Sequence, residues 1–370
     1  MSDTTQATAQ VATPSLVASD RLYPARRALE AVAGPLFALL LAAAVFSVFL
    51  MVLGKSPADF LSLLLLGAFA STFSLQNTLQ RAAPLLLTAL CVAVPAQLGL
   101  VVIGGEAAVV LGGLAATIVP LLLGNAWPPL QQILMAVAGI GVGAGWIAIT
   151  GVLRARRGIN ETVTSLVLSY IGIAIFNHLV EGPLRDPASL NKPSTYPIGD
   201  ANMLGHIPGT DLHPGLIVGV IACILCWILI FRTSLGFSMR VTGGNLRAAQ
   251  LQGLPVQRLI LLACLIGGGC AGLAGMIEVA AIQGSANASL IAGYGYAGIL
   301  IAFLSRQNPL AIIPMSVLLG GIGAAGGLVQ RRMDMPDATV AVLEGFIFVS
   351  ILAAETMRGR VAWFQPHART

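Results

Sequence analysis

Charged residues are scarce in this sequence. They make up 9% of its 370 residues, against about 25% in an ordinary soluble domain. A protein that folds in water needs a charged surface, so this scarcity excludes a soluble globular fold. Apolar residues make up 56% of the chain. We therefore predict an all-α, polytopic integral membrane protein.

Groups that enzymes and metalloproteins use are also missing. The four histidines lack metal-ligand spacing, and no Ser, His and Asp set is indicated. All five cysteines fall in apolar segments, which gives no disulfide framework. Gly54, Lys55 and Ser56 resemble the end of a phosphate-binding loop, but Phe49 stands where its first glycine belongs. We expect no catalysis, no metal site and no cofactor bound by this chain, ATP included.

The sequence also lacks a continuous basic surface. The net charge of +5 comes from arginines that stand singly or in small groups beside apolar runs. This pattern argues against a nucleic-acid partner. It favours a role of the arginines in orienting the chain in membrane lipid.

Long apolar runs are abundant. A membrane-spanning helix needs about 20 mainly apolar residues. The stretch 57–79 is ambiguous, because Gln76, Asn77 and Gln80 would be costly against lipid, and either an interfacial amphipathic helix or a re-entrant hairpin fits it. About ten other segments are candidate spans, roughly residues 31–53, 82–103, 106–123, 132–153, 162–180, 214–231, 259–280, 291–304, 309–329 and 337–355.

Arginine placement predicts the orientation of these spans, because cytoplasmic loops keep positive charge. The arginines at 21–27 place the N-terminus in the cytoplasm, and those at 358–360 place the C-terminus there too. Those at 154–157 and 232–258 mark two inner loops. The pair at 331–332 falls outside on this count, against the rule.

The domain organisation follows from these assignments. We expect a disordered cytoplasmic tail at 1–28, a transmembrane domain at 29–356 and a second cytoplasmic tail at 357–370. Within the transmembrane domain, the loop 181–213 is rich in Pro, Asp and Asn and lies outside. The polar loop 232–258 lies on the cytoplasmic side.

Two carboxylates at membrane depth are candidate pathway residues, since a charge at the bilayer centre costs about 2.5–3.5 kcal/mol even on a lenient scale. Glu106 follows two glycines, so it could begin a helix or face a pathway. Glu278 is the stronger candidate, because polar and aromatic side chains follow it: Gln283, Asn287, Tyr294 and Tyr296. Aromatic faces and amides suit a flat polar solute such as a nucleobase or a sugar, although the tyrosines could equally be interfacial anchors.

The polar segment "RVTGGNLRAAQLQGLP", Arg240 to Pro255, interrupts the apolar chain. Asn245 suits a helix N-cap, and residues 246–252 would make about two helical turns. Gly253 suits the C-cap, and Pro255 prevents continuation. A helix this short is not stable alone in water, so we expect it to gain its order by docking.

This segment is similar to the coupling segment of ABC importer permeases that serve simple sugars, nucleosides and branched-chain amino acids. Four further stretches resemble that family: "RGINETVTSLVLSYI" (157–171), "GPLRDP" (182–187), "AGLAGMIEV" (271–279) and "GYGYAGILIAFLSRQNPL" (293–310). Together they cover most of the chain from about Gly104 onward. The GINE and GPLRDP pair resembles in particular the longer permease of nucleoside importers that work with a lipoprotein receptor.

The resemblance implies a permease in the bacterial inner membrane that carries nucleosides, with simple sugars as the alternative cargo. It also implies three partners: a cytoplasmic ATP-binding subunit that uses ATP, a second permease subunit that is identical or paralogous, and an extracytoplasmic substrate-binding lipoprotein. An ion-coupled secondary transporter or channel, working through Glu106 or Glu278, is the competing class.

The same resemblance implies which residues contact the ATP-binding subunit. Arg247 and Arg240 would supply polar contacts, and Leu246, Ala248, Ala249 and Leu251 a packing face. The coupling residues expected on this basis are Arg240, Gly244, Asn245, Leu246, Arg247, Ala248, Ala249 and Gly253.

Overall fold

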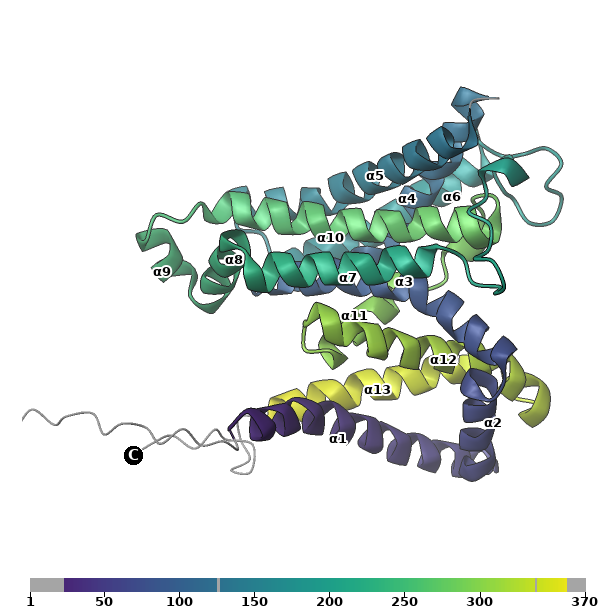
Figure 1. The fold of residues 1–370 in the computed structure, drawn as a ribbon, viewed down its shortest axis with the longest axis horizontal. Coiled ribbons are helices and arrows are strands. Elements are labelled where there is room, and N and C mark those ends of the chain that lie inside the picture. The colour runs from purple at the N-terminus through teal and green to yellow at the C-terminus, as the bar shows by residue number, and fades with distance from the viewer. Residues whose placement is uncertain (1–22, 125–126, 337, 358–370) are drawn as a thin grey trace, which may run out of the picture.

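The computed structural model describes residues 23–124, 127–336 and 338–357, and they form a bundle of helices (Figure 1). The long helices are α1 (Tyr23–Val52), α3 (Thr72–Ala96), α4 (Gly105–Leu123), α5 (Pro128–Arg157), α6 (Glu161–Glu181), α7 (Gly215–Arg232), α10 (Val256–Glu278), α12 (Pro309–Met333) and α13 (Ala338–Met357). The shorter ones are α2 (Pro57–Phe69), α8 (Ser234–Gly244), α9 (Leu246–Leu251) and α11 (Tyr294–Leu304). Single turns are η1 (Asp200–Asn202), the π-helical η2 (Val279–Gln283) and η3 (Ala288–Leu290).

Eight of the described helices are long and apolar enough to cross a membrane, which confirms the all-α polytopic prediction. The ten predicted segments correspond to these eight and to two shorter apolar stretches, α13 and the segment that contains α11. With 11 residues, α11 is about 16 Å long and reaches only about half-way across a 30 Å hydrocarbon core. The predicted span 291–304 is therefore a half-helix.

The first half of α3 differs from the prediction. Its helix begins at Thr72, capped by the Ser71 hydroxyl, and ends at Ala96, whereas we expected a span over 82–103. The ambiguous stretch 57–79 is accordingly divided between α2 and the first turns of α3. The polar residues Gln76, Asn77 and Gln80 thus lie on the end of a long helix.

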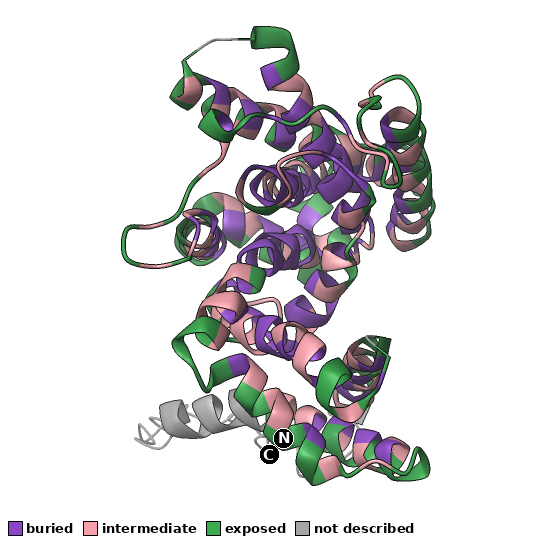
Figure 2. Ribbon diagram, turned by 90° about the vertical axis from the view of Figure 1, so that its right-hand side faces the viewer, coloured by how far each residue is buried: buried purple, intermediate pink, exposed green. Residues whose placement is uncertain are grey.

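Glycines bring the backbones of α4, α5 and α10 into direct contact. A Cβ at Gly112 of α4 would lie 2.5 Å from the Cα of Gly272 of α10, and a Cβ at Gly143 of α5 would lie 2.6 Å from the same atom. Backbones can approach this closely only where side chains are missing. Buried residues gather at the middle of the bundle (Figure 2), where these helices cross.

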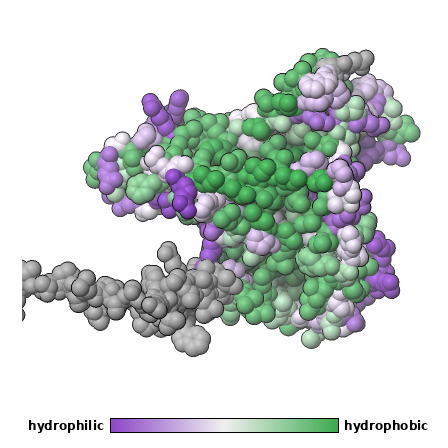
Figure 3. All heavy atoms as spheres, viewed as in Figure 1, coloured by the Kyte–Doolittle hydropathy of each residue, from purple (hydrophilic) through white to green (hydrophobic). Residues whose placement is uncertain are grey.

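The bundle has two ends with different polar segments (Figure 1). We call the end that carries α8 and α9 the coupling face, and the end that carries the loop 182–214 the loop face. Hydrophobic side chains cover the band between the two ends, and hydrophilic ones gather toward the ends (Figure 3). The first turn of α1 and the last turn of α13 lie toward the coupling face. The predicted tails fall largely outside the described residues, although α1 already begins at Tyr23, inside the tail expected at 1–28.

The loop between α6 and α7 packs on the chain that follows α10. The Thr195 N–H donates to the Ala286 carbonyl at 2.9 Å, and the Ile198 N–H donates to the Gly284 carbonyl at 2.9 Å. The Leu204 N–H donates to the carbonyl of Ala280 in η2 at 2.8 Å. The loop therefore holds the segment that turns back from α10 into the bundle as α11.

Candidate functional site

Glu106 lies in the first turn of α4 and is completely buried. One carboxylate oxygen accepts the Gly293 N–H at 2.8 Å, and the other accepts the Gly295 N–H at 2.6 Å. These N–H groups belong to the N-cap and the first turn of α11, so the carboxylate lies at the N-terminal ends of two helices. The positive end of each helix dipole favours an anion there. This explains how a carboxylate is tolerated at that depth.

Glu278 is the last residue of α10, and its side chain is 3% exposed. The π-helical turn of η2 follows and brings Gln283 back toward it, so that the amide nitrogen donates to Glu278 Oε1 at 3.4 Å. The other oxygen, Oε2, has no hydrogen-bond partner among the described residues. A buried carboxylate oxygen without a partner is uncommon and points to a ligand or to a different partner in another conformation.

Arg81 and Tyr294 complete the group of side chains around Glu278. Arg81 lies on α3 within electrostatic range of both Glu278 and Tyr294, the first residue of α11. Its guanidinium lies next to Gly323 of α12, where a Cβ would be 3.8 Å from Nη1. Four elements, α3, α10 with η2, α11 and α12, thus meet at one polar group, which we call the Glu278 cluster: Arg81, Glu278, Gln283 and Tyr294.

Arg81 is not among the site residues predicted from the sequence. The predicted span began at residue 82, which placed this arginine in a loop, where an arginine is ordinary. In the structure Arg81 is the tenth residue of α3, and an arginine within a spanning helix is costly and usually functional. An arginine at this depth of a spanning helix would have pointed to Arg81, but the predicted span began one residue too late to include it.

Two other predicted pathway residues lie apart from this cluster. Asn287 is 6% exposed and caps η3, because its Oδ1 accepts the Ser289 N–H at 2.9 Å. Tyr296 is 38% exposed and lies next to Ser169 of α6, on another side of α11 from Tyr294. Residues two apart on a helix point in different directions, so the two tyrosines cannot form one aromatic wall.

Local sequence explains the connection to the coupling segment. Thr233 caps α8, with its hydroxyl accepting the Gly236 N–H at 3.2 Å, and a Cβ at Gly236 would collide with the carbonyl oxygens of Leu229 and Ile230. The guanidinium of Arg240 lies over the Phe231 ring, 5.1 Å from its centroid. These contacts hold α8 at a fixed angle to α7 and occupy one face of Arg240.

The helix α9 begins at Leu246, as the sequence predicts, and ends at Leu251, one residue before the predicted end. The Asn245 side chain accepts the Ala248 N–H at 3.0 Å, and Gly253 has a positive φ of 76°, so each end is capped. Its exposed face differs from the expected packing face. Leu246 and Leu251 are 45% and 89% exposed, whereas Ala249 is completely buried within the chain.

Comparison with known proteins identifies the family. Residues 74–352 match the family described as branched-chain amino acid transport system / permease component. The chain is 31% identical to the glucose ABC transporter permease protein TsgB13 of Haloferax volcanii, over 87% of each chain. It is 28% identical to the guanosine permease NupP of Bacillus subtilis, over 88% of this chain and 94% of that one. It is 26% identical to the nucleoside permease NupB of Lactococcus lactis, over 86% and 89%.

The chain therefore belongs to this family of ABC transporter permeases. It is an importer permease of the sugar and nucleoside class and a multi-pass protein of the bacterial inner membrane. Permeases of this family are not themselves enzymes; a partner ATPase uses the ATP.

Proposed function

We propose that this chain forms the translocation pathway for nucleosides and couples it, through α9, to a separate cytoplasmic ATPase. The observation that carries the proposal is the Glu278 cluster, in which a buried carboxylate oxygen has no partner among the described residues and lies beside an amide and an aromatic ring. A nucleoside has hydroxyl donors for the carboxylate and a flat base for the ring of Tyr294. The names of NupP and NupB, both nucleoside-class permeases, support the same cargo.

The exposed face of α9 supports the ATPase contact. Leu246 and Leu251 present large apolar side chains to solvent, and Arg247 is exposed between them. Both ends of the helix are capped, and Ala249 is buried within the chain, so the permease itself holds α9 in place. A short rigid helix with exposed leucines and an arginine suits a groove on another protein. Ala249, in contrast, anchors α9 to the permease itself.

Two further partners complete the proposal. A second permease subunit, identical or paralogous, encloses the pathway, because Arg81 is exposed on this chain although it lies well inside a spanning helix. A substrate-binding lipoprotein delivers the nucleoside at the loop face. On this assignment the coupling face is cytoplasmic, as the inner arginines predict.

Sugar transport is the second candidate, because the glucose permease TsgB13 shares 31% identity with the chain. The same carboxylate and amide could bind sugar hydroxyls, and Tyr294 could pack on the sugar ring. Membership in the permease family argues against the ion-coupled secondary transporter, since that class needs no ATPase.

The experiment that tests the proposal is uptake into lipid vesicles that contain the permease with its ATPase, its second permease and its lipoprotein receptor. Labelled guanosine, uridine and glucose are added in turn, with and without ATP on the side of the vesicle membrane where the ATPase lies. We expect ATP-dependent uptake of a nucleoside. If glucose is the only solute taken up, the cargo of this permease is a sugar and not a nucleoside. Equal uptake without the ATPase would overturn the importer assignment.

A further inference from the structure

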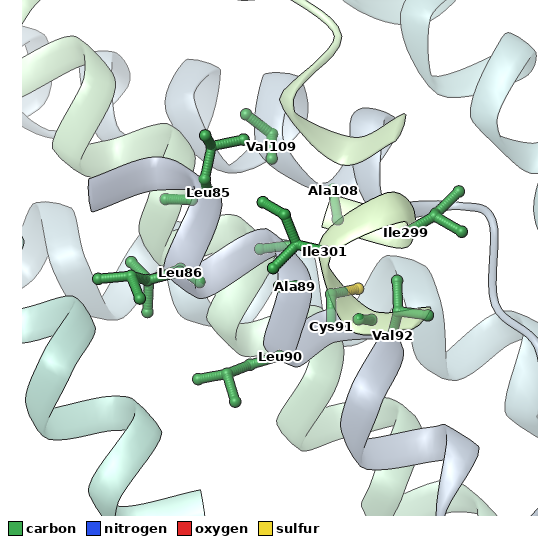
Figure 4. Close-up of a cluster of buried hydrophobic side chains, with 14 of the residues drawn as sticks. Leu85, Leu86, Ala89, Leu90, Cys91, Val92, Ala108, Val109, Ile299 and Ile301 are labelled. Carbon is green, nitrogen blue, oxygen red and sulfur yellow. The ribbon is translucent and has the colours of Figure 1, made fainter. Parts of the chain in front are cut away.

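The half-helix α11 is attached by polar contacts at both ends and is otherwise apolar. Its Ile301 is completely buried beside Ala89 in the apolar cluster between α3, α4 and α11 (Figure 4). Ile299 points in another direction and is also buried. A Cβ at Gly298 would lie 2.7 Å from the carbonyl carbon of Thr88 of α3. Such close packing makes the half-helix move as one body.

The first attachment lies at its N-terminus, beside the Glu278 cluster. Glu106 accepts the N–H groups of Gly293 and Gly295 at 2.8 and 2.6 Å. Tyr294, between these two glycines, is the member of the Glu278 cluster that α11 contributes. A displacement of α11 therefore moves Tyr294 relative to Glu278.

The second attachment lies at the corner between α11 and α12, toward the coupling face. The Gln97 amide nitrogen donates to the Gln307 carbonyl at 3.1 Å and to the Ala93 carbonyl at 3.2 Å. Gln307 and its neighbour Arg306 have left-handed backbones, with φ of 59° and 51°. Such backbones are costly for residues other than glycine and persist only where their surroundings hold them.

Gln97 also touches the coupling segment. A Cβ at Gly243, near the end of α8, would collide with the carbonyl oxygen of Gln97, so the two backbones are in contact. A Cβ at Gly99 would in turn lie 3.7 Å from the Gly243 carbonyl oxygen. Two residues after Gly243, Asn245 caps α9. Gln97 thus lies between the helix that we assign to ATPase docking and the corner that ends α11.

We propose that α11 carries movement of the coupling segment to the pathway, with Gln97 and Glu106 as the positioning residues at its two ends. The proposal rests on the proposed function, because it needs an ATPase that moves α9. A shift of Gly243 displaces Gln97, Gln97 displaces the strained corner at Gln307, and the packed half-helix displaces Tyr294. Small shifts at one end of a rigid element can select between two packings at the other.

The test is the number of solute molecules moved per ATP hydrolysed by the complete complex in vesicles. Gln97→Glu keeps the side-chain size but replaces the donor by an acceptor that faces two carbonyls. We expect ATP hydrolysis to persist and the ratio to fall about fivefold or more, the factor that the loss of one hydrogen bond brings to an equilibrium. Gln97→Lys, which restores donors, should recover most of the ratio, whereas a role in packing alone would give no such recovery.

Gln132→Glu is the matched control. Gln132 makes the same kind of bond, from its amide nitrogen to the Met203 carbonyl at 3.0 Å, but joins α5 to the loop face. We expect its ratio to equal that of the wild type. An unchanged ratio in Gln97→Glu, or an equal fall in Gln132→Glu, would overturn the proposal.

The same experiment distinguishes misfolding of a variant, failure of the proposed function and failure of the role proposed for α11. If Gln97→Glu does not accumulate as folded protein, Gln97→Ala takes its place, because it removes the donor without adding charge. Its ratio of solute moved to ATP hydrolysed is then compared with that of the wild type. If the wild-type complex shows no ATP-dependent uptake, the proposed function fails. If the wild type is coupled and the Gln97 variants are equally coupled, only the role of α11 fails.

Discussion

Glu106 and Gly295 are joined by a 2.6 Å hydrogen bond from the glycine N–H to the carboxylate, across 189 residues of sequence. The bond fixes the N-terminus of α11 to the first turn of α4. Both oxygens of Glu106 accept hydrogen bonds from the chain itself, whereas Oε2 of Glu278 accepts none from the part of the chain that the structure describes. The two membrane carboxylates therefore differ in their surroundings, and we propose that Glu106 positions a helix whereas Glu278 faces the solute.

Glu106→Gln tests the first role. The amide has one acceptor oxygen, so one N–H of α11 loses its acceptor and faces an NH₂ group. We expect a loss of about 1–3 kcal/mol in stability and a fall in uptake of roughly tenfold. Thermal unfolding in detergent and vesicle uptake measure the two effects.

Glu161→Gln is the control for that substitution. Glu161 is also a first-turn acid, but its partner is the partly exposed Arg154, at 3.2 Å. The Arg154 side chain is 36% exposed, so solvent screens this pair in part, and the new amide keeps one acceptor oxygen for Arg154. We therefore expect a smaller loss of stability than in Glu106→Gln. Equal losses in the two variants would mean that Glu106 has no special part in holding α11.

Gly295→Ala tests the contact from the other side. A Cβ there would collide with the backbone of Glu106, and backbone cannot yield as a flexible side chain does. We expect loss of uptake together with a destabilised fold. Gly141→Ala of α5 has open space within 4 Å and is expected to leave stability unchanged or raise it by up to about 1 kcal/mol. A fully active Gly295→Ala protein would contradict the tight approach of α4 and α11.

Arg81 and Glu278 should behave as a coupled pair in transport. Arg81→Ala leaves the carboxylate without its nearby cation, and Glu278→Gln removes the charge that the cation balances. We expect each single variant to lower uptake by about tenfold or more and the double variant to be less impaired than the product of the two. Initial uptake rates of the four proteins give the interaction. Independent, multiplicative effects would show that the two side chains act separately.

The buried imidazole of His213 predicts a pH dependence at the loop face. Burial lowers the pKa of His213 from its ordinary value of 6.5. The unfolded chain then binds a proton at a higher pH than the folded protein does, so stability is complete above about pH 6.5 and falls as the pH drops below it. Thermal unfolding at pH 7.5 and 5.5 should show this decline in the wild type and a smaller one in His213→Gln. An equal decline in stability in both proteins would show that titratable groups other than His213 cause the pH dependence.

The parts of the molecule that local chemistry decides could be predicted from the sequence. The start of α9 follows from the cap at Asn245, which was identified from its type alone. The glycine predicted as its C-cap, Gly253, has a positive φ but lies one residue beyond the C-cap Gln252. Glu278 could be selected because a carboxylate in an apolar run is costly wherever the helix lies.

The parts that depend on packing could not be predicted in the same way. Hydropathy counts apolar residues but does not distinguish lipid from the protein interior, so α11, which is buried against α3 and α4, resembled a full span. The part played by Gln97 depends on contacts with Gln307 and Gly243, which lie more than 140 residues away in sequence. The burial of Ala249 likewise follows from how α9 lies against its neighbours.

The exposed leucine on α9 offers the most direct test of the account. Leu251→Asp places a charge on a side chain that is 89% exposed, so the permease itself should fold normally. The measurement is ATP-dependent nucleoside uptake by the reconstituted complex, together with co-purification of the ATPase. We predict that Leu251→Asp loses both while thermal stability is kept, and that wild-type uptake requires the ATPase. Wild-type levels of uptake and of bound ATPase in Leu251→Asp would contradict the assignment of α9 as the site through which ATP drives transport.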